Sequence, residues 1–595
     1  MKQRNYIGLA CTGHDNALAI VNSAGEVVFA EATERYLQNK RAFDAGPDDL
    51  IRIEELVEHH CEPGAELVLA KSWSEGATEF GRAATRVLDA EISGLREHHV
   101  TTVSGAATSY IAFQINKLLG LRRLLEMAAD TQARAGRNVV FRYGDRVAAC
   151  RHYDHHLTHA ATACWSSPFS EAVCAVVDGF GEGASVALFH YRNGDIERIQ
   201  GPTQAWTFAS LGELYADVCR LCGFDPWKGE EWKVMGLAPY GEHDPYLYRN
   251  LRNCIAIEDL RLVRPVQQAA AMARVVRRAR KPDKSLLSAA NMAATGQQVF
   301  EELMLTLCQR LWNLGLSDHL ILSGGCALNS SFNGKVVADT SFSSLFVPSA
   351  PADDGNAIGS ALLAYREDHP EKQFARQAQS AYLGSSVSRL ALERAARGWG
   401  TDGVERLDEL TMTREVSRRL AAGQLVGWVQ GRAEFGPRAL GNRSILADPR
   451  RPEMKDRINA AVKYRERFRP FAPSILHEHG PRYFEDYQDS PYMERTLRFR
   501  MEMASRVPAV VHINRTGRLQ SVTAERNPRF YALLQAFLHE TDVPLLLNTS
   551  FNVMGKPIIH SVEDAIAVFV TSELDALVID DHLFFKARGE PCRPS

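Results

Sequence analysis

A pattern of three short strands that occurs twice in the first 200 residues limits the fold more than any other feature of the sequence. Each copy runs strand, polar corner, strand, turn, strand, with strand candidates at 6–10, 17–21 and 27–30, and again at 172–177, 184–190 and 196–199. The first corner (11–16) reads CTGHDN and the second (178–183) reads DGFGEG. Because the copies begin about 165 residues apart, they predict a duplicated α/β domain.

In a duplicated domain of this kind the two corners face each other across a cleft that can hold phosphates and a metal. The actin, sugar-kinase and Hsp70 ATPase group is built in this way; the alternative is a pair of unrelated meanders. A polar, charged passage at 367–380 predicts a linker between a first domain, 1–366, and a second α/β domain, 381–595. The clearest strand of the second domain is expected at 425–430 (LVGWVQ).

The composition argues against several classes of protein. Of 595 residues, 45% are hydrophobic and 24% charged, and the formal net charge is −3, which favours an ordinary globular enzyme over a nucleic-acid or membrane-surface binder. We expect no membrane span and no signal peptide. The eleven cysteines are scattered, and the one C-x-x-C pair, Cys219 and Cys222, is interpreted as two core residues. A reduced, cytoplasmic protein is expected.

Four histidines lie within eight residues, in the segment RHYDHHLTHA (151–160). On a helix, His155 and His159 stand four residues apart and project side by side, a spacing that suits two imidazoles on one metal ion, whereas His156 would point elsewhere. Such a pair needs carboxylates as well. Asp178 ends a strand, and Asp353 and Asp354 lie in a turn before a helix of small residues. The mixed nitrogen and oxygen set favours Fe²⁺, Mn²⁺ or Zn²⁺ over Ca²⁺, with Mg²⁺ as an alternative.

Two further motifs provide candidates in the first domain. Gly324 and Gly325, in SGGCALN, follow a predicted buried strand at 319–322 and would let the backbone approach a flat or anionic ligand, although a tight turn needs the same glycines. His14 stands at the first corner, and because imidazole side chains are general bases suited to neutral pH, it is a candidate base for an attacking hydroxyl.

The second domain holds the strongest local charge. Eleven Lys/Arg stand against five Asp/Glu between residues 432 and 470, an excess of +6 in a chain of net charge −3. Lys463, Arg465, Arg467 and Arg469 alternate, so an extended stretch would present all four on one face. Arg432, Arg438 and Arg443 come from a loop rich in glycine, and guanidinium groups converging from two segments suit a phosphate or carboxylate. Nucleic acid is the weaker alternative because exposed aromatic residues are not interleaved.

These motifs together resemble the O-carbamoyltransferases of the NodU/CmcH/TobZ type. The resemblance rests on GHD (13–15), DHHLTHA (154–160), VDGFGE (177–182), KVMGLAPYG (233–241), SGGCALN (323–329), GRAEFGPRALGNRSILADPR (431–450), VKYRERFRPFAPS (462–474) and LNTSFN (547–552). It implies an N-terminal domain like TsaD, on the actin-like ATPase fold, followed by a smaller YrdC-like α/β domain. In the family, carbamoyl phosphate yields carbamate in the YrdC-like domain; carbamate passes internally to the larger domain and reacts with ATP to form carbamoyl adenylate, which a hydroxyl attacks.

Carried onto this sequence, the resemblance implies roles for individual residues. The metal ligands fall on His155, His159, Asp178 and Asp353, with Fe²⁺ preferred and Mg²⁺ or Mn²⁺ as alternatives, and the base falls on His14. Asp353 is preferred to Asp354 because it aligns with the aspartate that opens the family's turn. ATP and adenylate contacts fall on Gly324, Gly325, Asn329, Lys233 and Asp354. The carbamoyl-phosphate site falls on Arg438, Lys463, Arg469, Arg518 and Ser550.

The expected partners are therefore carbamoyl phosphate, ATP and a hydroxylated small-molecule acceptor, a natural product, with neither nucleic acid nor membrane; a homodimer is allowed. The acceptor wall is expected from residues 72–135 and 200–235. Two alternatives stay open: an enzyme of the tRNA threonylcarbamoyladenosine type, against which the net charge argues, and an actin-like ATPase that signals through conformation.

Overall fold

The computed structural model describes residues 3–101, 105–199, 209–374, 376–400 and 403–586. It forms two compact units: residues 1–37 with 41–379, and residues 38–40 with 380–595. Among the described residues, no helix has both the length and the apolar character that crossing a membrane requires.

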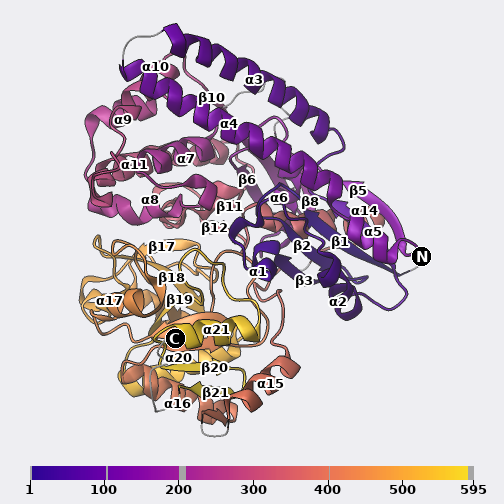
Figure 1. Ribbon diagram of the computed structural model, residues 1–595, viewed down its shortest axis with the longest axis vertical. Helices are drawn as coiled ribbons and strands as arrows, with labels where there is room; N and C mark the ends of the chain where they lie inside the picture. Colours follow the sequence, from indigo (N-terminus) through magenta and orange to yellow (C-terminus); the bar gives the residue numbers. More distant parts are fainter. Residues whose placement is uncertain (1–2, 102–104, 200–208, 375, 401–402, 587–595) are drawn as a thin grey trace, which may run out of the picture. The chain divides into compact units, whose positions relative to one another are not determined.

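The first unit contains two five-stranded sheets with the same topology (Figure 1). The strands of the first sheet are β1 (Arg4–Ala10), β2 (Ala17–Val21), β3 (Val27–Ala32), β4 (Glu66–Lys71) and β5 (Val147–His152). Those of the second are β6 (Glu171–Val177), β7 (Val186–Arg192), β8 (Asp195–Arg198), β11 (His319–Ser323) and β12 (Ser344–Phe346).

The pairing within the two sheets confirms the predicted duplication. In order along the sheets, β3-β2-β1-β4-β5 corresponds to β8-β7-β6-β11-β12. In each, the first strand pairs antiparallel with the second and parallel with the fourth, and the outer pairs repeat as well. Two copies of one β-meander extended by parallel crossover strands make the actin-like ATPase type of domain that the sequence pattern predicts.

Two helices, α6 (His155–Trp165) and α14 (Asn356–Asp368), pack against each other, with α14 on the first sheet and α6 on the second. Glycines allow the close approach. A Cβ at Gly359 of α14 would lie 1.9 Å from the carbonyl oxygen of Thr158, and one at Gly8 of β1 would lie 1.8 Å from that of Ala357. The N-terminal ends of α6 and α14 carry the motifs of the predicted metal site, so this packing decides the position of that site.

Longer helices complete the first unit. α3 (Ala77–Thr101) and α4 (Gly105–Arg134) pack against each other (Figure 1), while α7 (Leu211–Leu221) and α8 (Trp232–Leu237) pack against α11 (Ala290–Trp312). Cys219 and Cys222, at the end of α7, are buried and unbridged, as expected of core residues.

The second unit is built on one nine-stranded mixed sheet in the order β13-β21-β20-β14-β15-β19-β16-β18-β17. These strands are β13 (Val404–Arg406), β14 (Val426–Val429), β15 (Arg443–Ala447), β16 (Ala472–Leu476), β17 (Arg495–Arg498), β18 (Thr516–Val522), β19 (Leu545–Ser550), β20 (Ala576–Ile579) and β21 (His582–Phe585).

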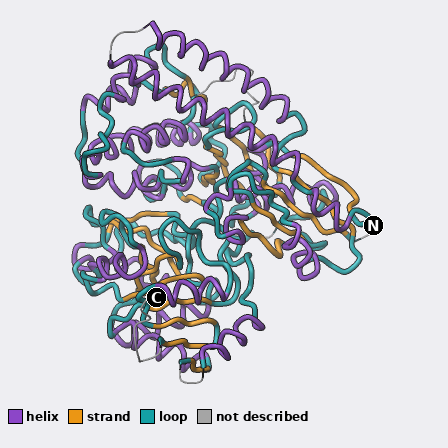
Figure 2. Tube along the Cα trace, in the orientation of Figure 1, coloured by secondary structure: helices purple, strands orange, loops and turns teal. Residues whose placement is uncertain are grey.

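One hydrophobic core joins the nine-stranded sheet to helices that include α16 (Glu409–Ala421), α20 (Pro528–Thr541) and α21 (Val562–Thr571), which lie around the strands (Figure 2). Strand β14 falls inside the predicted stretch 425–430 because LVGWVQ is apolar on both faces and both faces are covered. A second α/β unit after the duplicated one is therefore confirmed; its likeness to the YrdC fold rests on the resemblance alone.

Candidate functional site

Two buried histidines stand on one face of α6. The helix begins where Asp154 accepts a hydrogen bond from the backbone N–H of Leu157 at 2.9 Å. His155 and His159 are four residues apart, so their rings lie side by side, with centroids separated by 4.9 Å. His156 faces away from this pair, and its Nε2 has no hydrogen-bond partner among the described residues. The four-residue spacing on this helix therefore places one imidazole nitrogen of each histidine near the same point.

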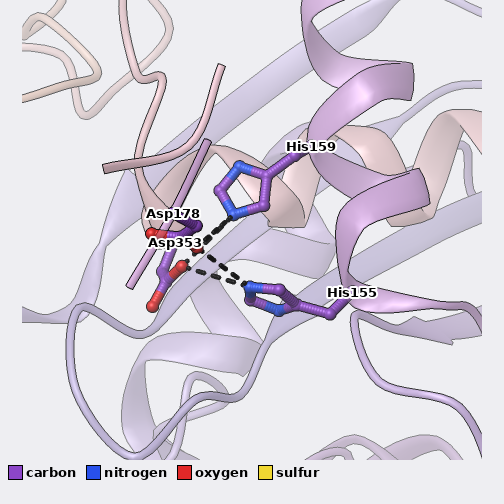
Figure 3. A group of neighbouring side chains, drawn as sticks. All are labelled: His155, His159, Asp178 and Asp353. Carbon is purple, nitrogen blue, oxygen red and sulfur yellow. Dashed lines mark hydrogen bonds and ion pairs between the residues drawn. The ribbon is translucent and has the colours of Figure 1, made fainter. Parts of the chain in front are cut away.

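Two carboxylates meet this pair (Figure 3). Asp178 follows the last residue of β6, and Asp353 begins the short turn Asp353–Gly355 that leads into α14. The Nε2 atom of His159 lies 3.3 Å from both Asp178 Oδ2 and Asp353 Oδ1, and that of His155 lies 3.3 Å from the first and 3.5 Å from the second. The four potential ligand atoms all lie within 4.8 Å of one another. The two halves of the duplicated domain therefore converge on one cluster.

Backbone N–H groups and an aromatic ring fix the positions of Asp178 and His155 in this cluster. Asp178 Oδ1 accepts backbone N–H groups from Gly179 at 2.8 Å and Gly325 at 3.1 Å, which leaves Oδ2 directed at the histidines. Trp73 stacks on His155 with ring centroids 4.4 Å apart. Although burial lowers the pKa of His159, hydrogen bonds with Asp178 and Asp353 outweigh it and raise the pKa to about 9. Buried carboxylates and imidazoles therefore hold each other at hydrogen-bond distance.

This donor set fits a divalent transition metal. Two imidazole nitrogens and two carboxylate oxygens are the mixture that Fe²⁺, Mn²⁺ and Zn²⁺ accept, whereas Ca²⁺ and Mg²⁺ prefer oxygen alone. Two backbone N–H groups on the outer oxygen of one carboxylate supply the support behind the ligands that metal sites need.

The neighbouring aspartates, Asp353 and Asp354, occupy different environments. Asp354 contributes no atom to the cluster; its Oδ1 accepts the backbone N–H of Gly355 at 3.1 Å. Burial, together with the nearby carboxylates of Asp15, Glu34 and Asp353, raises the pKa of Asp354 to about 7. The geometry thus supports Asp353 as the ligand-bearing position.

His14 lies next to the cluster, 3.9 Å from Asp353 Oδ2. Its Nδ1 lies 2.9 Å from Asp15 Oδ2 and 2.9 Å from the Nη2 atom of Arg41, and Arg41 Nη2 also donates to Asp15 at 2.8 Å. Sequence reasoning missed Arg41. The backbone of Arg41 has a left-handed φ of 63°, which the sequence KRAFD does not predict.

The predicted nucleotide contacts are spread over three places. Gly324, at φ 85°, is required by packing, because a Cβ there would lie 2.4 Å from the carbonyl oxygen of Val177. Asn329 exchanges hydrogen bonds with Gln297 at 3.0 and 3.1 Å and caps the next helix, which gives it a structural role. Lys233, in α8, is buried and pairs with Glu230 at 2.8 Å. Contact of these residues with ATP stays a prediction.

Among the residues that the structure describes, the buried Lys463 of the second unit forms no ion pair with a carboxylate. Lys463 donates to the carbonyl oxygens of Ser550 and Asn552, and to the side-chain oxygens of Asn552 at 2.7 Å and Ser550 at 3.3 Å. Burial, with the nearby guanidinium groups of Arg465 and Arg469, lowers the pKa of Lys463 well below its usual value.

Four arginines share this environment. Burial and then the charges of Arg438, Arg465 and Arg469 lower the pKa of Arg518 well below its usual range, and burial lowers that of Arg438 to about 10. The Nε of Arg518 is buried without a hydrogen-bond partner among the described residues. Glu466, 3.3 Å from Arg469, is the acid that pairs with a member of this group. The structure thus gathers the predicted cations, with Arg465 added, into a cluster of like charge, which we call the basic cluster: Arg438, Lys463, Arg465, Arg469 and Arg518.

The prediction of one extended basic face is wrong. Residues Asn459–Lys463 form a π-helical turn that continues the preceding helix, and Tyr464 then adopts a left-handed φ of 46°. Arg467 consequently points into solvent, 81% exposed, and pairs with Asp456 at 2.6 Å.

Two further arginines were also expected to converge on the anion, and that expectation is wrong. Arg443 is buried and donates to the carbonyl oxygens of Gln430 and Ser385, while Arg432 donates to that of Gly384. Both stabilise loops rather than bind a ligand.

Known proteins resemble this chain over most of its length. Two family models match the chain: the one described as the carbamoyltransferase N-terminus matches residues 104–362, and the one described as the carbamoyltransferase C-terminus matches residues 417–586. The uncharacterized protein sll1178 of Synechocystis is 36% identical over 473 residues, which cover 73% of this chain and 76% of that protein. Nodulation protein NolO of Bradyrhizobium diazoefficiens is 36% identical over 444 residues, covering 73% and 79%. Nodulation protein U of Rhizobium fredii is 30% identical over 444 residues, covering 69% and 71%. Both halves of the chain match, so the chain belongs to the carbamoyltransferase family and is a carbamoyltransferase enzyme.

Proposed function

We propose that this carbamoyltransferase takes its carbamoyl group from carbamoyl phosphate, activates it with ATP, and transfers it to a hydroxyl of a small-molecule acceptor. The observation that carries the proposal is the presence of two chemically different sites, one in each unit. The second unit gathers cations whose like charges lower the pKa values of Arg518 and Lys463, and the first gathers imidazoles and carboxylates beside His14.

The basic cluster supports carbamoyl phosphate as the donor. Carbamoyl phosphate carries about two negative charges near neutral pH, and a dianion would relieve the repulsion that lowers the pKa values of Arg518 and Lys463. Guanidinium groups grip a phosphate through paired hydrogen bonds, whereas Lys463 offers a point charge beside Ser550. There, carbamoyl phosphate and water would give carbamate and inorganic phosphate.

The cluster in the first unit supports the use of carbamate and ATP. His155, His159, Asp178 and Asp353 would hold a divalent metal, with Fe²⁺ as the preferred ion and Mn²⁺ or Mg²⁺ as alternatives. Such a metal, when bound, neutralises developing negative charge on phosphate oxygens. Attack of the carbamate oxygen on the α-phosphorus of ATP would give carbamoyl adenylate and release pyrophosphate.

His14 would serve as the base in the transfer step. When Nδ1 carries its proton and donates it to Asp15 Oδ2, Nε2 is the nitrogen that can take a proton from the acceptor hydroxyl. The hydroxyl oxygen then attacks the carbamoyl carbon, AMP leaves with the bonding electron pair, and the product is a carbamate ester.

The test is to identify the nucleotide product. With ATP, carbamoyl phosphate and a mixture of hydroxylated compounds, the proposal requires AMP and pyrophosphate, and a product heavier by one carbamoyl group. Release of ADP with a phosphorylated acceptor would refute it, and strongly salt-dependent binding of RNA would favour the tRNA-modifying alternative. Arg518→Met should strongly reduce carbamoyl-phosphate-dependent release of pyrophosphate, whereas Arg467→Met, at an exposed position of the segment that carries Lys463 and Arg469, should leave it unchanged.

A further inference from the structure

A cavity of about 290 Å³ lies in the first unit between α4 and the segment that follows α7. Its aromatic lining comes from Phe113, Phe224 and Trp227, with Pro226 beside them, and its polar lining includes Asn116 and Lys117. The described parts of 72–135 and 200–235, the two stretches expected to form the acceptor wall, supply these residues; residues 102–104 and 200–208 lie outside the described part of the chain.

Arg41 connects this cavity to the reaction centre. One end of its guanidinium group, Nη1, donates to the carbonyl oxygen of Pro226 at 2.9 Å, and the other, Nη2, lies 2.9 Å from Nδ1 of His14. The ring of Phe43 lies between the two sites: its centroid is 6.2 Å from the ring centroid of His14 and 6.1 Å from that of Trp227. A single side chain thus reaches from the cavity wall to the histidine beside the metal-binding cluster.

The charges at the cavity are already paired. Lys117 lies 2.6 Å from Asp217 and 3.4 Å from Glu213, and Arg220, the second lining cation, lies 2.8 Å from Asp217. The lining carboxylate of Asp225 accepts the backbone N–H of Trp227 at 3.0 Å and lies 3.8 Å from Nζ of Lys228. Two cations stand against two carboxylates behind the wall, so a charged ligand would meet no unmatched partner, whereas a neutral ligand can still accept and donate hydrogen bonds at the polar edge.

Resting on the proposed function, we infer that this cavity binds the acceptor and that the acceptor portion it takes is a single uncharged, hydroxylated ring, such as a pyranoside or cyclic polyol. Flat aromatic side chains match the apolar faces of such a ring, and the amide and paired charges match its hydroxyl edge. The volume of about 290 Å³ suits one ring rather than a chain of several.

Binding of a panel of rings, measured by saturation-transfer NMR and calorimetry, tests this inference. We expect methyl glucoside, methyl N-acetylglucosaminide or myo-inositol to bind the wild-type enzyme, and glucosamine and glucuronate, which carry a charge, to bind at least about tenfold more weakly. Trp227→Ala should weaken binding of the neutral rings by about tenfold or more, while Trp227→Phe keeps an aromatic face and should restore most of it. Phe141→Ala, at an aromatic residue that is 74% exposed outside the cavity, is the matched control.

A glycine offers a second variant that removes no lining group. A Cβ at Gly120 of α4 would lie 2.4 Å from Cζ2 of Trp227, so Gly120→Ala must displace the indole and should weaken ring binding as well. Gly94→Ala is its control, because a Cβ at Gly94 of the neighbouring α3 meets no atom within 4 Å. A melting temperature close to that of the wild type shows that each variant is folded.

Two outcomes would overturn the inference: none of the neutral rings binds the wild-type enzyme, or Trp227→Ala and Gly120→Ala bind them as tightly as it does. Carbamoyl-phosphate-dependent exchange between ATP and pyrophosphate, which needs no acceptor, is measured in parallel. If that exchange is absent from the wild-type enzyme, the proposed function fails; if it is present in all variants while ring binding fails, the inference alone is wrong.

Discussion

Arg518 offers the sharpest test of the basic cluster because its charge should destabilise the folded protein and, at the same time, strengthen the binding of carbamoyl phosphate. It lies on β18 among three other guanidinium groups, its Nε lacks a hydrogen-bond partner within the described structure, and burial followed by those like charges lowers its pKa. Arg518→Met replaces the charge with an apolar side chain of similar length. We expect the variant to be more stable than the wild-type protein when no anion is bound.

The magnitude follows from the partial burial of the side chain. Replacing a buried ion pair with well-packed apolar side chains is neutral or stabilises a protein by about 1–4 kcal/mol, and for the single, half-buried charge of Arg518 we take the lower half, about 1–2 kcal/mol. Binding moves in the opposite direction. Each lost charge-assisted hydrogen bond to phosphate costs about 1.5–3 kcal/mol, so the Kd for carbamoyl phosphate should rise by roughly 10- to 150-fold.

Urea unfolding with and without inorganic phosphate measures both effects. At a phosphate concentration 100 times its Kd, the free energy of unfolding of the wild-type protein should increase by about 2.7 kcal/mol, while Arg518→Met should gain far less. Arg467→Met, at an exposed ion pair with Asp456, should change stability by less than about 0.5 kcal/mol under both conditions. The reasoning is refuted if Arg518→Met is less stable than the wild type without phosphate, or if phosphate stabilises both proteins equally.

Three further predictions address the remaining groups. Asp353→Asn should lower metal affinity by at least about tenfold, measured by elemental analysis after dialysis, while Asp354→Asn should retain the metal because its carboxylate lies outside the cluster; equal loss in both would contradict the geometry. His14→Asn should slow carbamoyl transfer by about 10²- to 10⁴-fold yet preserve ATP–pyrophosphate exchange, and loss of both activities would deny it the role of base. Because burial lowers the pKa of Lys463, the unfolded chain binds more protons than the folded protein between that lowered pKa and the usual 10.5, so the free energy of unfolding should rise with pH in this window. Lys463→Met should remove that part of the slope of unfolding free energy against pH. An unchanged slope in the variant would show that Lys463 titrates normally.

The parts of the fold that the sequence predicts are those with a local signal. The repeated meander is visible because each strand is short, apolar and bounded by turn residues, and α6 is visible because its histidines repeat at helical spacing. Asp178 and Asp353 come together because each follows a strand of the second sheet, β6 or β12, that runs parallel to β11, so the carboxyl ends of these strands lie at one edge of that sheet. Local spacing within a known topology is therefore enough to bring four residues together that lie up to about 200 positions apart in the chain.

The errors come from interactions that no local pattern records. The alternation of Lys463, Arg465 and Arg467 imitates a strand, but the preceding helix continues as a π-helical turn and rotates Arg467 into solvent. Arg443 resembles a ligand-binding cation by composition alone, yet its donors bond to the backbone carbonyl oxygens of Gln430 and Ser385. Arg41 escapes notice because its role depends on a left-handed backbone and on the distant residue Pro226.

The two clusters differ in a way that explains why the spacing of residues predicts the members of the first but assigns wrong arginines to the second. In the metal-binding cluster, imidazoles and carboxylates hold each other at 3.3–3.5 Å, so the same residues that would bind the ion also fix one another's positions. In the basic cluster the side chains repel each other, so their positions must be fixed by neutral groups around them, such as the oxygens of Ser550 and Asn552 that bind Lys463. The members of a site whose groups attract one another can be predicted from the residues themselves. The members of a site of like charge depend on the surrounding structure, which holds the charges together.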